Sequence, residues 1–136
     1  MFQNMPQEIE VKYILPAIRR EFSKILVREK KYSQKQAAKI LDITEAAVSQ
    51  YFNSRRAKEV VFTEDVIQEM RNSIDKLIAN HSKPIIIGEI YRICNLTTVR
   101  QILCGIHKAK SKDLEECKVC FEGCESECEV QLIKTV

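Results

Sequence analysis

Apolar side chains recur at helical spacing along most of this 136-residue chain. In the first segment, PQEIEVKYILPAIRREFSKILVREKK, they form one stripe with Arg and Lys between them: Ile14, Ile18, Phe22, Ile25 and Leu26. The spacing predicts an amphipathic helix. Pro16 lies inside the pattern, so we expect the helix either to kink there or to begin anew with Pro16 in its first turn. The apolar stripe is suited equally to a core within the chain and to a dimer interface.

The pattern between residues 32 and 60 predicts two short helices separated by a tight turn. Ser33 can cap the first helix and Thr44 the second, which leaves about three residues, 42–44, for the turn. Small Ala38 lies where the two helices would cross. Three apolar residues can hold the corner between them: Leu41, Ile43 and Val48. This arrangement is a helix-turn-helix, in which the outer face of the second helix projects from the domain.

Further helices are predicted after the helix-turn-helix. Thr63 opens an amphipathic helix with Glu64 and Asp65 in its first turn, and its apolar face consists of Val66, Met70, Ile74 and Leu77. Pro84 begins another helix, and Thr97 caps a last one. With only three glycines and three prolines, the chain predicts an all-α fold of about five to six helices followed by a Cys-rich tail. We divide it into regions 1–62, 63–110 and 111–136.

The net charge of +3 conceals a gradient along the chain. Residues 1–60 carry twelve Lys or Arg against seven Asp or Glu, residues 61–110 seven against five, and residues 111–136 three against seven. A basic front half favours a polyanionic partner, although an ordinary solvated surface also explains an imbalance of this size.

The residues of the helix-turn-helix resemble a known family. The order Ser33, Gln34, Ala38, Leu41, Ile43, Thr44, Val48, Ser49, Tyr51 is similar to the repressor/Cro-type helix-turn-helix of the xenobiotic-response-element family. Asp42 is a departure, because that family usually has glycine in the turn, but aspartate tolerates the left-handed conformation. Over most of its length the chain also resembles archaeal predicted transcriptional regulators that combine this motif with C-terminal cysteines, through stretches such as QKQAAKIL, AAVSQYF, LCGIHK and CKVC.

The motif predicts double-stranded DNA as the partner, with the second helix in the major groove. Its polar face carries Glu45, Ala46, Ser49, Gln50 and Asn53 after the capping Thr44, and Gln50 can pair with adenine N6 and N7. Phosphate contacts are expected from residues that flank this helix: Ser33, Gln34, Arg55, Arg56 and Lys58. Because one such domain covers little DNA, we expect a homodimer, and the first helix is a candidate interface.

Four cysteines lie within twelve residues near the end of the chain, in the pattern C-x2-C-x3-C-x3-C: Cys117, Cys120, Cys124 and Cys128. A C-x2-C turn directs two thiolates to one metal, and residues 111–136 have too few apolar side chains to fold without such a centre. The run favours a 4Fe-4S iron-sulfur cluster, with zinc as the alternative. A third interpretation of the four cysteines is a disordered acidic tail with free thiols.

Two further cysteines, Cys94 and Cys104, lie in apolar helical surroundings, where a cysteine commonly serves as a small buried apolar residue. The resemblance to the archaeal regulators implies instead that Cys94 and Cys104 join Cys117 and Cys120 as the four ligands. His107 is a weaker candidate ligand. The spacing does not choose between these sets.

The sequence thus predicts a DNA-binding transcriptional regulator that senses redox or iron state through its cluster. The alternatives are a regulator with a structural zinc site and, in another class, an iron-sulfur electron-transfer or interaction protein. A phosphate-binding loop and a Ser-His-Asp set are missing from the sequence, so we do not expect an enzyme or a small-molecule substrate. The chain has neither an apolar run of membrane-spanning length nor a secretory leader, and we expect a cytoplasmic protein that binds no membrane.

Overall fold

The computed structural model describes residues 5–53 and 60–110, and all of its regular elements there are helices. The first four elements, α1 (Pro6–Ile9), η1 (Glu10–Ile14), α2 (Leu15–Lys24) and η2 (Ile25–Glu29), follow one another without a break. They are succeeded by α3 (Gln34–Leu41), α4 (Glu45–Asn53), α5 (Glu64–Ala79), α6 (Lys83–Cys94) and α7 (Thr97–Lys110). When residues 6–29 are counted as one helix, the described part contains six helices, as the sequence predicts.

Residues 6–29 form one continuous helix that passes through Pro16. The residues at its internal joins, Glu10, Leu15 and Ile25, all keep right-handed helical dihedral angles. The turn before the proline is a π-helix, η1, in which the N–H of Leu15 bonds to the carbonyl of Glu10. Proline lacks an N–H and its ring crowds the preceding turn. A widened turn at this point lets the helix continue, because a π-helical turn no longer requires the ordinary bonding pattern.

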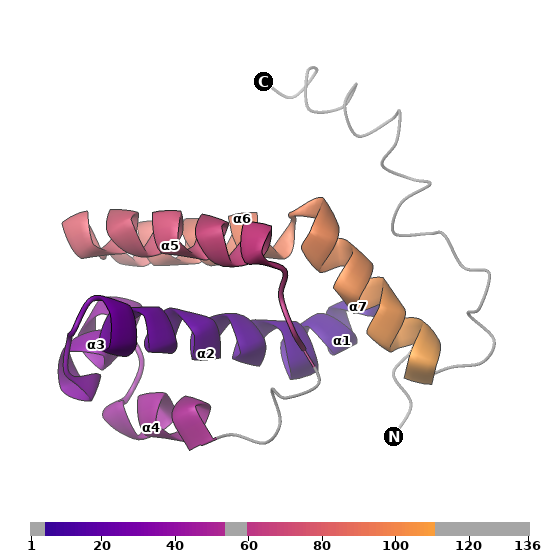
Figure 1. Ribbon diagram of the computed structural model, residues 1–136. Coiled ribbons are helices and arrows are strands. Elements are labelled where there is room, and N and C mark those ends of the chain that lie inside the picture. Colours follow the sequence, from indigo (N-terminus) through magenta and orange to yellow (C-terminus); the bar gives the residue numbers. More distant parts are fainter. Residues whose placement is uncertain (1–4, 54–59, 111–136) are drawn as a thin grey trace, which may run out of the picture.

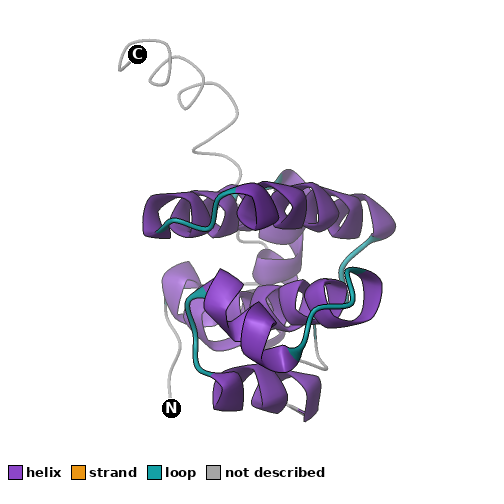
Figure 2. Ribbon diagram, turned by 90° about the vertical axis from the view of Figure 1, so that its left-hand side faces the viewer, coloured by secondary structure: helices purple, strands orange, loops and turns teal. Residues whose placement is uncertain are grey.

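The helices form two layers (Figures 1 and 2). α5 and α6 lie side by side in one layer, while the 6–29 helix lies in the other with α3 beside it. α4 packs on the side of α2 that faces away from α5 and α6, and α7 crosses one end of the molecule. α4 is therefore supported from within the domain, and none of the described helices covers its outer side.

A single hydrophobic core joins the regions 1–62 and 63–110. The stripe predicted on the first helix is buried there, with Ile14, Ile18, Phe22 and Leu26 fully enclosed. The apolar face predicted on α5 meets it: Val66, Met70, Ile74 and Leu77. Burial of an aliphatic or aromatic side chain contributes about 1.5–3 kcal/mol, so this shared core is the main source of stability. Because the first helix buries its apolar face in the chain's own core, that face is not available to bind a second copy of the chain.

Polar contacts also tie the layers and the helices together. Arg20 is buried and its Nη2 donates to the carbonyl of Val60, 2.9 Å away, which holds the chain where it returns toward α5. Between α5 and α6, Arg92 Nη1 lies 2.6 Å from Glu69 Oε2, and Arg92 Nη2 lies 2.9 Å from Ser73 Oγ. Ser73 donates to Glu89 at 2.8 Å. These contacts satisfy polar groups that the packing of α5 on α6 would otherwise leave unpaired.

None of the described helices combines the length and the apolar character required to cross a membrane. The Cys-rich tail, residues 111–136, lies outside the described residues.

Candidate nucleic-acid interface

The first helix of the candidate motif, α3, begins with a complete capping box. The backbone N–H of Gln36 donates to Ser33 Oγ at 3.1 Å, and the backbone N–H of Ser33 donates to Gln36 Oε1 at 2.9 Å. Both bonds satisfy amide groups that a helix N-terminus leaves without partners. The predicted cap at Ser33 is confirmed, and the start of α3 is fixed by the sequence S-Q-K-Q itself.

The turn between α3 and α4 depends on the left-handed conformation of Asp42. This residue has φ 55° and ψ 45°. The N–H of Ile43 then reaches the carbonyl of Ala38 at 3.0 Å, and the N–H of Asp42 that of Lys39 at 3.3 Å. This is the Schellman pattern that closes a helix. Aspartate therefore adopts the conformation that glycine would supply at this position, and the turn keeps the predicted length.

The second helix, α4, is held by its inner face. Val48 is 0% exposed and belongs to the hydrophobic core, and Ala38 and Leu41 of α3 are buried beside the corner. At the N-terminus of α4 the backbone N–H of Ala47 donates to Thr44 Oγ1 at 3.0 Å, which confirms the predicted cap. Near the other end the guanidinium of Arg28 lies over the ring of Phe52, 5.4 Å from its centroid. These contacts fix both the direction of α4 and its rotation about its own axis.

The outer face of α4 is polar and open to solvent. Glu45, Ala46, Gln50 and Asn53 are exposed, and Ser49 is half-buried. The side-chain amide of Asn53 donates to the carbonyl of Ser49 at 3.2 Å, one turn back in the same helix. Gln50 makes no side-chain hydrogen bond to any of the described residues, so both its amide oxygen and its amide nitrogen are exposed toward solvent. Among the predicted contact residues, Gln50 is thus the best positioned to read a base.

The predicted phosphate-binding residues fall into two groups. Ser33 and Gln34 are exposed at the N-terminus of α3. Arg55, Arg56 and Lys58 lie outside the described residues, so their predicted role stays a prediction. A helix N-terminus carries a partial positive charge and free N–H groups, which suits an anionic oxygen near residues 33 and 34.

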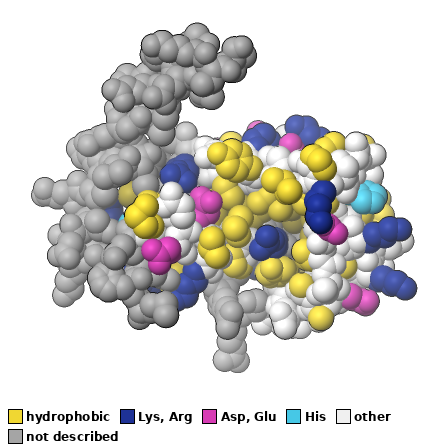
Figure 3. Space-filling view, turned by 180° about the vertical axis from the view of Figure 1, so that it is seen from behind, with side chains coloured by type: hydrophobic (Ala, Val, Ile, Leu, Met, Phe, Trp, Pro, Cys, Tyr) yellow, Lys and Arg dark blue, Asp and Glu magenta, His cyan; other side chains and the backbone are white. Residues whose placement is uncertain are grey.

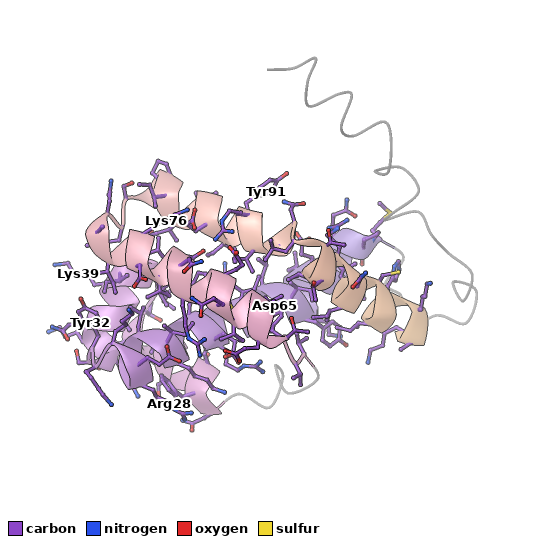
Figure 4. All side chains as sticks on the ribbon, turned by 45° about the horizontal axis from the view of Figure 1, so that its top comes forward. Arg28, Tyr32, Lys39, Asp65, Lys76 and Tyr91 are labelled. Atoms are coloured by element: carbon purple, nitrogen blue, oxygen red, sulfur yellow. The ribbon has the colours of Figure 1, made fainter. Side chains whose placement is uncertain are left out.

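Other basic residues near the motif did not figure among the predicted contacts. Lys35 and Lys39 are exposed on α3, and Arg28 is exposed where it stacks on Phe52. Figure 4 shows Lys39 at the end of the molecule formed by α3 and Arg28 near α4. The sequence does contain a pattern that could have identified them. Their positive charges lie between the apolar positions of residues 28–39, and helical periodicity places such polar positions on the solvent side.

The six candidate metal ligands divide between described and undescribed residues. Cys94 and Cys104 are buried and free of disulfide bonds. Burial raises the pKa of the Cys94 thiol to about 11, with a smaller contribution from the nearby carboxylate of Glu10. In residues 5–53 and 60–110, no three His, Cys, Asp or Glu side chains come together in a group that could hold a metal ion. Cys117, Cys120, Cys124 and Cys128 lie outside these ranges.

No family model, curated protein or solved structure matches the chain. The resemblance to repressor/Cro-type regulators therefore stays a prediction from the sequence. Any inference about function rests on the geometry of α3 and α4.

The cap at Thr44 gives a measurable consequence. Replacing Thr44 with alanine removes the bond to the N–H of Ala47, and we expect the free energy of unfolding to fall by about 0.5–2 kcal/mol. Thr63 is a matched control, because it occupies the same position before α5 but its side chain makes no capping bond. Urea unfolding of the two variants should show the larger loss for Thr44→Ala. Equal losses would mean that the cap does not hold α4.

Proposed function

We propose that this protein binds double-stranded DNA sequence-selectively and regulates transcription, with α4 lying in the major groove. The observation that carries the proposal is the division of α4 into two faces. Val48 anchors the inner face in the core, while Glu45, Ala46, Gln50 and Asn53 form an exposed outer face. A helix held in this way can enter a groove about 12 Å wide without exposing apolar residues to water or losing its support.

The chemistry of the outer face fits base edges. Gln50 offers an amide oxygen and an amide nitrogen, the pair of groups that adenine N6 and N7 require. Ala46, one turn earlier, is small and apolar, and such a side chain can contact the methyl group of thymine. Ser49 can bind either kind of base, and Glu45 at the start of α4 can accept a hydrogen bond from cytosine N4.

The surroundings of α4 fit the phosphate backbone. In helix-turn-helix proteins the first helix of the motif crosses the backbone while the second enters the groove. Here the exposed N-terminus of α3, with Ser33 and Gln34, and the exposed side chains of Lys35 and Lys39 supply positive potential beside α4. Contacts of this kind position a protein on the duplex and contribute affinity without sequence information.

A homodimer and a sensing role remain predictions from the sequence. The large exposed apolar side chains of α6, Ile87 at 63% and Tyr91 at 71% exposure, are an alternative to the buried stripe of the first helix as a surface for a second copy. Figure 3 shows apolar side chains gathered on the face opposite to that of Figure 1, where α6 lies in front. Sedimentation of the full chain at several concentrations tests the dimer. Operator affinity before and after oxidation tests the proposed control by redox state.

Salt dependence tests the proposed function directly. Each phosphate contact made by Lys or Arg should lower the logarithm of the affinity by about 0.9 per unit of log salt concentration on duplex DNA. We expect fluorescence anisotropy with a labelled duplex to give a slope that corresponds to several contacts. A slope near zero, or an affinity for duplex DNA no greater than that for an uncharged polymer, would refute the proposal.

A further inference from the structure

One face of α6 is exposed, apolar and free of charge. Five large apolar side chains are exposed in the described part of the chain, and Ile87 and Tyr91 are the only two of them that lie one turn apart on one helix. Pro84 and Gly88 are exposed on the same side of α6. Positions 84, 87, 88 and 91 therefore form one stripe, here called the α6 stripe. Their spacing is the one by which a helix packs on another surface.

The α6 stripe points away from the other helices. α6 lies beside α5 in one layer, and Tyr91 projects from it on the side away from α5 (Figure 4). Figure 3 shows apolar side chains gathered on this side of the molecule. α4 belongs to the other layer and packs on the side of α2 that faces away from α6. A partner on the α6 stripe thus leaves the outer face of α4 open.

Gly88 is the residue of the stripe that the fold of a single chain does not explain. Glycine weakens the interior of a helix relative to alanine, and it is suited to a positive φ or to the close approach of another group. Gly88 has no positive φ, and no atom of another described element comes within 4 Å of the place where its Cβ would lie. The close approach of a partner's helix accounts for a glycine at this position.

The order of residues along the α6 stripe makes it complementary to itself. When two copies of α6 cross antiparallel with positions 87 and 88 at the centre, Ile87 of each copy lies opposite Gly88 of the other. Pro84 and Tyr91 are equally far from this centre, so they also lie opposite each other, once on each side. Each large side chain then meets a small or flat one. Two surfaces related by a two-fold axis require this reciprocal fit.

We propose that this protein forms a homodimer in which the α6 stripe packs antiparallel on the α6 stripe of a second copy. Ile87 of each copy fills the space over Gly88 of the other, and Tyr91 covers Pro84. Burial of these apolar side chains, which one copy alone leaves in water, supplies the driving force. The inference does not rest on the proposed contact between α4 and DNA.

The charges of the chain favour a second copy over residues 111–136 as the partner of the stripe. Residues 111–136 carry three Lys or Arg against seven Asp or Glu, and an acidic segment is attracted to a basic surface. The α6 stripe has no charged side chain, so two stripes meet without repulsion between like charges. Lys83, at the start of α6, lies 3.7 Å from Asp42 of its own chain, which offsets its charge.

Sedimentation of the full chain in the absence of DNA tests the dimer. α6 has 12 residues and is about 18 Å long, so the interface is at the small end of specific ones, roughly 1,200 Å² or less. We therefore expect a reversible dimer that dissociates at concentrations on the order of micromolar. Gly88→Gln should weaken the dimer by about tenfold or more, because the added side chain holds the two helices apart.

Gly105→Gln is the matched control. Gly105 is exposed in the middle of α7, and no atom of another described element lies near its missing Cβ. Its neighbours on that face are polar or small, with Gln101 and Ala109 exposed one turn away on either side. Glutamine favours a helix more than glycine does, so both variants should fold at least as well as the original chain. The dimer should be unchanged in Gly105→Gln.

Photo-crosslinking identifies what covers the stripe. A photoreactive phenylalanine derivative in place of Tyr91 keeps an aromatic side chain at that position. Light chains are mixed with chains labelled with heavy nitrogen, so that mass spectrometry separates links between copies from links within one chain. We expect links between light and heavy chains that map to residues 84–88, and we expect Gly88→Gln to remove most of them.

Three results would overturn the inference. The first is a chain that stays monomeric at hundreds of micromolar, and the second is a Gly88→Gln variant that dimerises as tightly as the original. The third is a set of crosslinks from position 91 to residues 111–136 of the same chain, which would assign the stripe to the chain's own tail. Since none of these measurements includes DNA, a failure of the proposed DNA contact would leave their outcomes unchanged.

Discussion

Replacing Gln50 with alanine should weaken binding to a preferred DNA sequence by about 5- to 160-fold, which corresponds to roughly 1–3 kcal/mol for one bidentate base contact. The preferred sequence is first obtained by selection from a random duplex library. Binding to unrelated duplexes should change little, because it depends on phosphate contacts that Gln50 does not make. Gln50 is exposed on α4, so its removal leaves the core intact and unfolding should be nearly unaffected.

Gln68→Ala provides the control for this experiment. Gln68 is an exposed glutamine in the second turn of α5, in the layer of the molecule away from α4. Its replacement should leave both the affinity and the sequence preference unchanged. If Gln50→Ala bound the selected sequence as tightly as the original protein, α4 would not read bases through this residue.

The largest effect on stability is expected at Phe22. This side chain is fully buried in α2, in the core shared by both layers. Phe22→Ala should lower the free energy of unfolding by about 3–5 kcal/mol, because it combines a loss of buried apolar surface with a cavity. The total free energy of unfolding of a domain is about 5–15 kcal/mol, so this loss would be a large fraction of it. Urea unfolding followed by circular dichroism measures the change.

Tyr91→Ala is the matched aromatic control. Tyr91 is 71% exposed on α6, and at concentrations where the chain is monomeric its removal should change the free energy of unfolding by about 0.5 kcal/mol or less. Similar losses for the two variants would show that residues 6–29 do not form the centre of the core.

Much of the fold follows from short-range patterns in the sequence. The stripe from Ile14 to Leu26 and the stripe from Val66 to Leu77 identified two core-facing helices, since burial of one face imposes the helical period. Ser33 and Thr44 marked helix starts, because their hydroxyl groups can bond the free N–H groups of the first turn. Prediction of the last helix start was one residue late. Thr97 is the first residue of α7 and not the residue before it.

Other features of the fold depend on contacts that the spacing of apolar residues does not reveal. The π-helical turn before Pro16 was not predicted, and the sequence alone left a kink and a new start equally open. The bond from Arg20 to the carbonyl of Val60 joins residues forty positions apart. The pairing of Arg92 with Glu69 likewise depends on how α5 meets α6.

At the candidate site, too, some features follow from the sequence and others depend on the three-dimensional structure. Once Val48 is assigned to the core, helical geometry places residues 46, 50 and 53 on the opposite side of α4, and the structure has them exposed. Glu45 lies closer to the side of Val48 and is exposed in the first turn of α4. The bond from Asn53 to the carbonyl of Ser49 was not foreseen, because it depends on the side-chain rotamer. Cys94 and Cys104 have similar sequence neighbourhoods, and the structure buries both thiols, with the residues 4% and 8% exposed.

Site-specific photo-crosslinking measures most directly whether the outer face of α4 touches duplex DNA. A photoreactive amino acid replaces Ala46, exposed on α4, or Ala79, an alanine that is also exposed, at the end of α5, in the full chain. With the selected duplex, we expect crosslinks from position 46 that map to major-groove bases and none from position 79. Crosslinks from position 79 alone, or none from position 46 under conditions where the protein binds, would contradict it.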